Sequence, residues 1–240
     1  MGNPLARAAG MVRGVVVVTG TDTDVGKTYA TAALALAGYS AGRRRVAVYK
    51  PVQTGVVGDD SGDVDDVARL CAAAGLPGGA LTTHEGQRLS EPMAPPPAAD
   101  LDGVALLSLD DHAERIAALL HEHDLVLVEG SGGVLVELDG EGHNIADLTQ
   151  IIRRAVDPHV HVVLVVRSGL GTLNHTLLSL EALCRRGVRV LGTVLGSWPA
   201  NPQPLHETNR NYIRTIQAQD GTNIPLLGAV PQGWGAADGM

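Results

Sequence analysis

A strand, a glycine-bounded loop and a helix follow one another in the stretch Gly14 to Tyr29, which reads GVVVVTGTDTDVGKTY. Val15 to Val18 form a β-branched run typical of a strand buried on both faces of a parallel sheet. The alanine- and leucine-rich residues 29–37 favour a helix. At such a junction the loop N–H groups and the helix N-terminus point at an anion, while Lys27 supplies positive charge and Thr28 a metal-ligating hydroxyl. The stretch predicts a loop that binds the phosphates of a nucleoside triphosphate.

This loop is a variant of the usual phosphate-binding pattern, because Thr21 stands where the first glycine is expected and Gly20 comes one residue earlier. The flanking strand and helix support the assignment in spite of the shifted glycine. The residues predicted to contact the nucleotide are Gly20, Thr21, Asp22, Thr23, Asp24, Val25, Gly26, Lys27 and Thr28.

Length and composition restrict the class of protein. The chain has 240 residues and no apolar run of transmembrane length, so one large α/β domain is expected over residues 14–240. Residues 1–13 are small, polar and irregular, and we expect them to form a disordered extension, with Met11 as an alternative start. The net charge of -8 argues against a nucleic-acid partner, and Arg43 to Arg45 are expected to cover a helix C-terminus.

The two cysteines, Cys71 and Cys184, form no C-x-x-C pair, so neither a disulfide framework nor a zinc site is expected. A reducing cytoplasm is the expected compartment, with no membrane partner.

Strands and helices are predicted to alternate along the whole chain, which indicates a doubly wound, mainly parallel α/β sheet with right-handed crossovers. The predicted strands are 15–18, 45–49, 125–128, 160–166, 188–195 and 226–230. The predicted helices are 29–37, 63–74, 108–122, a short one within 134–152, 170–186 and 206–219. Residues 76–103 are proline- and glycine-rich and are expected to be an irregular connection, in which the stiff piece 91–95 could form a pocket wall.

Charged residues follow several of these strands. Pro51 is expected to stop the second strand, which would leave Lys50 and Thr54 at the carboxyl edge of the sheet, where open α/β sheets bind ligands. Glu129 ends another apolar strand and is placed to hold Mg²⁺. Five aspartates crowd the start of the helix 63–74, and most are expected to be caps, although one could reach a metal. They are Asp59, Asp60, Asp63, Asp65 and Asp66.

Together, Lys27, Thr28, Lys50 and Glu129 predict a site for a nucleoside triphosphate with Mg²⁺ and an additional lysine beside the γ-phosphate. Phosphoryl transfer is accelerated mainly by positioning and by stabilising charge on the transferring group. The residues therefore favour group transfer over a purely mechanical switch.

Four separated motifs, GTDTDVGKT, KPVQTG, VEGSGG and LGTLNHTLLSLEAL, resemble those of dethiobiotin synthetases, over about Val15 to Pro231. The resemblance implies a phosphate-loop NTPase fold and an ATP-dependent ring closure in biotin synthesis. In that family CO₂ converts one amine of 7,8-diaminopelargonic acid to a carbamate, which attacks the γ-phosphate. The second amine then closes the ring and releases phosphate.

The resemblance also implies residue roles. Thr23, Lys27 and Lys50 would stabilise the carbamate and the transferring phosphoryl group, and Mg²⁺ would be held by Thr28, Asp63 and Glu129. Substrate would contact Thr54 and Gly132, and in a homodimer the neighbouring subunit would complete its pocket with Leu170, Gly171, Thr172, Leu173 and Asn174. The nucleotide base would lie near Gly196, Ser197, Trp198 and Pro199.

Two departures from the family pattern stand out. Ser131 replaces a common alanine and adds a hydroxyl near the substrate. The segment 196–199 reads GSWP where many members have a purine-reading asparagine, so other triphosphates could be accepted alongside ATP.

The main alternative is a partition or septum-positioning ATPase. Those proteins carry a second lysine five residues before the usual one, and here that position is Asp22.

Overall fold

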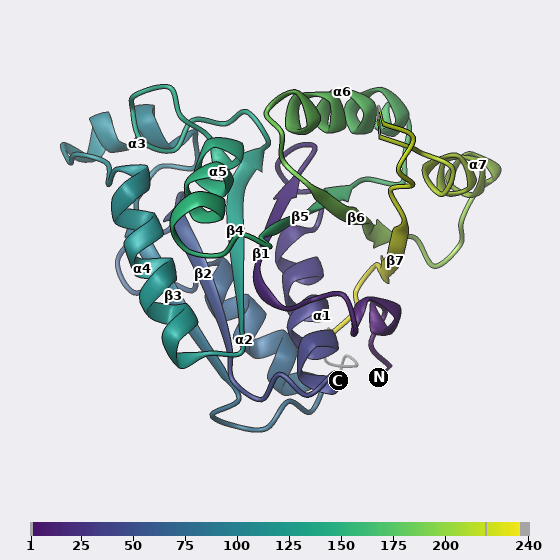
Figure 1. Ribbon diagram of the computed structural model, residues 1–240, viewed down its shortest axis with the longest axis horizontal. Helices are drawn as coiled ribbons and strands as arrows, with labels where there is room; N and C mark the ends of the chain where they lie inside the picture. Colours follow the sequence, from purple (N-terminus) through teal and green to yellow (C-terminus); the bar gives the residue numbers. More distant parts are fainter. Residues whose placement is uncertain (1, 219, 236–240) are drawn as a thin grey trace.

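One sheet of seven parallel strands organises the part of the chain that the computed structural model describes, residues 2–218 and 220–235 (Figure 1). The strands are β1 (Gly14–Gly20), β2 (Val46–Gln53), β3 (Leu81–Arg88), β4 (Leu125–Gly133), β5 (His161–Val166), β6 (Val190–Trp198) and β7 (Leu226–Pro231). Their order is β3-β2-β4-β1-β5-β6-β7, and every ladder is parallel. The carboxyl ends of the strands therefore share one edge, and ligands bind at that edge in open parallel sheets.

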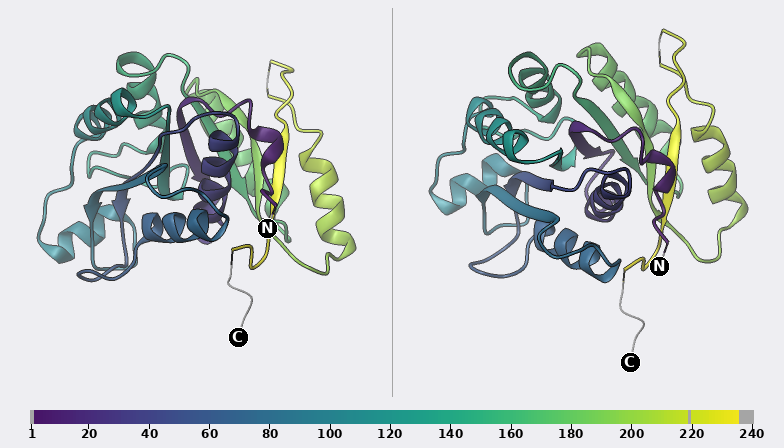
Figure 2. Two further views of the ribbon diagram at one scale, coloured as in Figure 1. Left: turned by 90° about the horizontal axis from the view of Figure 1, so that it is seen from below. Right: turned by 60° about the horizontal axis from the view of Figure 1, so that its bottom comes forward.

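Helices cover both faces of this sheet, which confirms the doubly wound α/β fold. They are α1 (Lys27–Ser40), α2 (Asp63–Ala73), α3 (Pro95–Asp102), α4 (Leu109–Glu122), α5 (Ile145–Ala155), α6 (Thr172–Arg185) and α7 (Pro204–Ile213). The buried side chains of α1 and α2 belong to one hydrophobic core, and those of α4, α5, α6 and α7 to the other. The two layers are separated by the sheet (Figures 1 and 2).

The valine run of β1 supplies both cores. Val16 and Val18 pack into the core shared with α1, whereas Val15 and Val17 point to the opposite side. Successive strand residues face opposite sides of a sheet, so a strand covered on both faces must be apolar at every position. The sequence prediction for this strand is confirmed, and it sets the position of the loop that follows.

The N-terminal segment differs from the expected disordered extension. Residues 6–8 form a short 3-10 helix, and Leu5, Ala8 and Val12 are completely buried in the core of α1. The amide of Asn3 also donates to the carbonyl of Ala33 on α1, at 3.1 Å. Figure 2 shows the segment lying beside β7, so apolar residues scattered among small ones are sufficient to dock it there.

Two predictions about local structure are wrong. Pro51 does not stop β2, which continues to Gln53 and still pairs with β3 on both sides of the proline. Residues 76–103 are not wholly irregular, since they contain the edge strand β3 and the helix α3. The sequence did not predict β3, because its residues, LTTHEGQR, are mostly polar and only half-buried, as those of an edge strand can be.

The last predicted helix is also shorter than expected. It ends at Ile213, and Gln219, its predicted end, lies outside the described residues.

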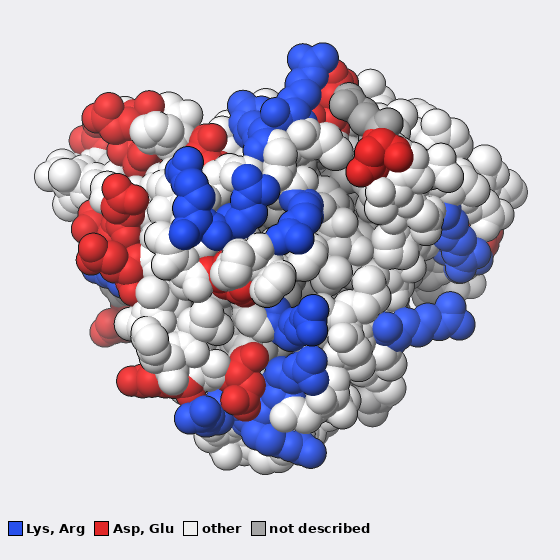
Figure 3. Space-filling view, in the orientation of Figure 1, with Lys and Arg blue, Asp and Glu red and all other residues white. Residues whose placement is uncertain are grey.

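Arginines gather at the ends of helices, as expected for residues 43–45. Arg43 donates to the carbonyl of Ala41, which caps α1, at 2.6 Å. Arg153 and Arg154 occupy the last turn of α5. Figure 3 shows Lys and Arg side chains in groups over one face, with Asp and Glu gathered at its left edge. Arg43, Arg153 and Arg154 complement the negative C-terminal ends of the dipoles of α1 and α5.

Candidate active site

Close backbone contacts shape the loop between β1 and α1. Gly26 precedes α1 with a φ of 94°, and a Cβ atom there would lie 2.4 Å from the carbonyl oxygen of Gly196. A side chain is excluded on both grounds. The ammonium of Lys27 donates to the carbonyl of Asp22 at 3.0 Å, so this buried side chain curls back over the loop. The loop therefore combines a helix N-terminus with a buried cation, as an anion site requires.

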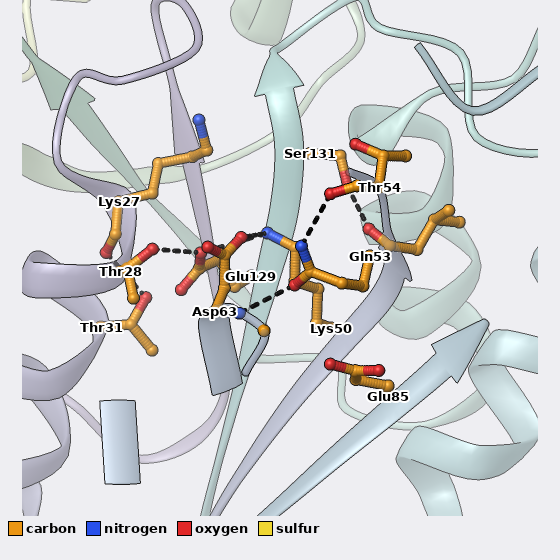
Figure 4. Close-up of polar contacts among 12 residues, drawn as sticks. Lys27, Thr28, Thr31, Lys50, Gln53, Thr54, Asp63, Glu85, Glu129 and Ser131 are labelled. Atoms are coloured by element: carbon orange, nitrogen blue, oxygen red, sulfur yellow. Dashed lines mark hydrogen bonds and ion pairs between the residues drawn. The ribbon is translucent and has the colours of Figure 1, made fainter. Parts of the chain in front are cut away.

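Lys50, on β2, is enclosed by two carboxylates from other elements (Figure 4). Its side chain is 4% exposed, and its ammonium forms ion pairs with Asp63 at the start of α2 and with Glu129 on β4, the latter at 3.3 Å. Burial by itself lowers the pKa of Lys50, but the negative charges of Glu129 and Asp63 outweigh it and raise the pKa above its ordinary value. Lys50 is therefore a permanent positive charge at neutral pH.

Lys27 shows the opposite behaviour. Burial, and then repulsion from Lys50, lower its pKa below the ordinary value. The nearby carboxylates, Glu129 first, offset these two effects only in part, and a polyanion bound in the loop would raise the pKa of Lys27 further. Lys27 and Lys50 are also the only two lysines in the sequence, so every lysine ammonium of this protein lies in the site.

The oxygen atoms around Lys50 suit a magnesium ion. Thr28 donates its hydroxyl to Oε1 of Glu129 at 3.0 Å, and Oε2 of the same carboxylate is buried without a hydrogen-bond partner among the described residues. A buried carboxylate oxygen without a partner indicates a missing ligand. Hydroxyl and carboxylate oxygens are the donors that Mg²⁺ prefers, and Mg²⁺ commonly takes only one or two carboxylates. Thr28, Asp63 and Glu129 thus fit the predicted metal.

A cavity of about 700 Å³ opens beside these residues. The phosphate loop contributes Thr23 and residues 26–28 to its walls, and β2 contributes Lys50, Gln53 and Thr54. Residues 92–95 also line the cavity, which confirms that the proline-rich piece forms a pocket wall. Thr23, Thr54 and Gly132, predicted to contact reacting groups or substrate, therefore share one cavity with both lysines.

Ser131 lines the same cavity, but its hydroxyl donates to the carbonyl of Val52 at 2.5 Å. The extra hydroxyl relative to the family pattern is thus engaged by the sheet and is not directed at a ligand.

The segments predicted for the base and for the substrate carboxylate do not line this cavity. Gly196 contacts the phosphate loop directly, since a Cβ on it would lie 2.0 Å from the carbonyl oxygen of Val25. The start of segment 196–199 therefore adjoins the loop, whereas Trp198 stacks against Arg210 on α7. Leu170 is 83% exposed, and Gly171 adopts a left-handed conformation just before α6. Leu170, Gly171 and Asn174 are thus exposed within one chain, whereas Thr172 is fully buried and Leu173 packs partly against the core.

Three residues in and around the site make contacts that were not anticipated. Gln53 accepts a hydrogen bond from the backbone N–H of Asp63 at 2.9 Å and so fixes the start of α2. Arg167, after β5, forms an ion pair with Asp22 of the phosphate loop at 2.8 Å. Asn209, on α7, donates to the carbonyls of Ser168 and Gly169. These partners are 10 to 145 residues apart, so no local pattern reveals them.

Within the described residues, no helix is both long and apolar enough to cross a membrane.

Comparisons with known proteins place the chain in a family. The family model described as an AAA domain matches residues 14–234. The ATP-dependent dethiobiotin synthetase of Rhodococcus erythropolis is 44% identical over 222 residues, which cover 92% of this chain and 90% of that protein. The enzymes of the same name from Streptomyces avermitilis and Mycobacterium leprae are 44% and 43% identical, covering 92% and 93% of this chain and 85% and 89% of their own lengths. The chain therefore belongs to the dethiobiotin synthetase family.

Proposed function

We propose that this protein is an ATP-dependent dethiobiotin synthetase, a carbon–nitrogen ligase of biotin biosynthesis. It would join 7,8-diaminopelargonic acid and CO₂, supplied by bicarbonate, at the expense of ATP. The observation that carries the proposal is the position of Lys50, which lies between Asp63 and Glu129 in the cavity of the phosphate loop. A second buried cation beside the phosphates suits transfer of the γ-phosphoryl group to a carbamate.

The reaction has three steps. One amine of the substrate adds to CO₂ and loses a proton, which gives a carbamate. A carbamate oxygen then attacks the γ-phosphorus, the bond to the β–γ bridging oxygen breaks, and ADP leaves. Finally the second amine attacks the carbonyl carbon of the mixed anhydride, and phosphate leaves as the ureido ring closes.

Lys27 and Lys50 would neutralise the negative charge that gathers on the carbamate and on the transferring phosphoryl oxygens, and Thr23 would donate a hydrogen bond to the same group. Because Lys50 is already fixed by two carboxylates, little reorganisation is needed when that charge develops. Thr28, Asp63 and Glu129 would hold Mg²⁺, which would screen the charge of the nucleotide phosphates.

Substrate binding is proposed to need a homodimer. The exposed Leu170, with Leu173 and Asn174 behind it, would reach the pocket of the neighbouring subunit. Leucine side chains would cover the aliphatic chain, and the N-terminus of α6 with Asn174 would receive the carboxylate. Thr54 and Gly132 would complete the pocket from the first subunit. The base would bind beside Gly196, Ser197, Trp198 and Pro199, and the reaction would take place in the cytoplasm.

The proposal is tested by incubating purified protein with diaminopelargonate, bicarbonate, Mg²⁺ and ATP. Dethiobiotin and phosphate should form in equal amounts, measured by mass spectrometry and a phosphate assay. ATP hydrolysis that is stimulated by DNA, without dethiobiotin, would instead identify a partition-type ATPase. Competition by CTP, GTP and UTP against ATP then measures base selectivity.

A further inference from the structure

Arg88, the last residue of the edge strand β3, ties the loop that precedes α2 to the sheet. One of its terminal nitrogens, Nη1, donates to the carbonyl oxygens of Gly58 and Asp60, at 3.0 and 2.7 Å. Its other two nitrogens, Nε and Nη2, form a fork on the carboxylate of Glu85, at 2.7 and 2.9 Å. All three guanidinium nitrogens are thus used, and the planar fork makes arginine suited to this arrangement.

The loop that Arg88 holds leads directly to Asp63. Residue 62 lies against the sheet, because a Cβ on Gly62 would be 2.5 Å from Oε1 of Glu85 and 3.1 Å from Oε1 of Gln53. Gln53 also receives the backbone N–H of Asp63. The start of α2 is therefore fixed from two strands, by Gln53 on β2 and by the pair of Glu85 and Arg88 on β3.

Glu85 also lies next to Lys50, since the two residues are register partners on β3 and β2. A free carboxylate there would compete with Asp63 and Glu129 for the lysine. Both oxygens of Glu85 accept hydrogen bonds from Arg88, and no dashed line joins its carboxylate to the Lys50 ammonium in Figure 4. Arg88 thus keeps Glu85 from competing with Asp63 for Lys50.

We propose that Arg88 is a positioning residue for the metal site: through residues 58–62 and Glu85 it holds Asp63 where that carboxylate can bind Mg²⁺. The inference rests on the proposed role of Asp63 as a magnesium ligand. It makes the metal affinity of the site depend on a residue that does not itself contact the metal. Mutation of a residue that orients a metal ligand typically lowers metal affinity by about 10- to 100-fold.

The test measures metal binding without catalysis. Mn²⁺, which reports on a Mg²⁺ site, is titrated by electron paramagnetic resonance into the full-length protein holding a non-hydrolysable ATP analogue. Arg88→Ala and Arg88→Lys should each weaken Mn²⁺ binding by at least about tenfold. The lysine variant keeps the charge but cannot make the fork and both carbonyl contacts. Amide hydrogen exchange of residues 58–62 should become faster in both variants.

Arg69→Ala is the matched control, because Arg69 is another arginine near the site, on α2, and its ion pair with Asp66 leaves residues 58–62 untouched. It removes the same charge and should leave Mn²⁺ affinity unchanged. Melting temperatures show whether each variant is folded. If Arg88→Ala does not fold, the Mn²⁺ affinity of Arg88→Lys is compared with that of the wild type instead.

A double-mutant cycle separates positioning from general electrostatics. Asp63→Asn should itself weaken Mn²⁺ binding, and adding Arg88→Lys to it should cause little further loss, because Arg88 acts through Asp63. Fully additive losses, or wild-type Mn²⁺ affinity in folded Arg88 variants, would overturn the proposal. Neither result depends on dethiobiotin formation, so the proposed function is judged separately.

Discussion

Replacing Lys50 with methionine should separate nucleotide binding from turnover. The substitution keeps the unbranched stem and removes the charge that pairs with Asp63 and Glu129. Losing a preorganised donor of this kind lowers the rate of the chemical step by about 10²- to 10³-fold or more. Lys27 and the loop remain in place, so nucleotide affinity should be largely retained. Lys27→Met should weaken both properties.

The same variant has a calculable effect on stability. At 3.3 Å and an effective dielectric constant of about 20, the attraction between Lys50 and Glu129 is about 5 kcal/mol before desolvation is subtracted. Removing one partner of a buried pair costs about 3–5 kcal/mol, because the other charge is left uncompensated. The metal-free Lys50→Met protein should therefore unfold at a clearly lower temperature than the wild type.

Magnesium should reverse part of this loss. In the wild type Lys50 already pairs with the carboxylates proposed to bind Mg²⁺, whereas in Lys50→Met those carboxylates lack a cation. Adding Mg²⁺ should thus raise the melting temperature of the variant more than that of the wild type, in scanning fluorimetry with EDTA as the reference. An equal or smaller rise in the variant, or dethiobiotin formation at the wild-type rate, would refute this account of Lys50.

Further predictions concern pH and packing. The pKa of Lys27 is lowered in the free protein, so at alkaline pH Lys27 should take up a proton when ATP binds. ATP affinity should therefore weaken as pH rises towards the ordinary lysine pKa of about 10.4. Calorimetry in two buffers measures the proton uptake. Burial lowers the pKa of His112 to about 4, below its unfolded value of about 6.5. The free energy of unfolding should therefore be highest above pH 6.5 and fall by about 3 kcal/mol as the pH is lowered from about 6.5 to about 4. Urea unfolding at several pH values should show this loss, and His112→Gln should be less sensitive to pH. Leu5→Ala should cost about 2–5 kcal/mol in the free energy of unfolding because Leu5 is fully buried, while turnover at 25 °C stays unchanged.

Local patterns in the sequence were sufficient for the elements that form the centre of the site. The valine run and the G-K-T tripeptide predicted β1, the loop and α1. A strand buried on both faces and the start of a helix can each be recognised from a pattern of consecutive residues. The apolar run before Glu129 placed that carboxylate on a central strand in the same way. Parallel order then brings such residues to one edge of the sheet.

Other features depended on the packing of distant segments. The polar strand β3 and the docked residues 2–13 have no periodic signature, because an edge strand and a surface segment bury only part of their residues. Nothing in the acidic stretch at the start of α2 distinguishes Asp63 from its four neighbours by spacing. Its pairing with Lys50 depends on β2 and α2 being brought together.

The sequence by itself determined that a phosphate-binding loop stands between a buried strand and a helix, since loop conformation and helix initiation are set by neighbouring residues. Only the tertiary structure decided how that loop is completed. Residue 26 must be glycine because Gly196 of β6 lies against it. Lys50 is held in place because β2, β4 and α2 converge on one cavity. Arg88 contacts the approach to Asp63 from a strand that the sequence did not reveal. These contacts follow from the order of the strands, which juxtaposes residues that are far apart along the chain.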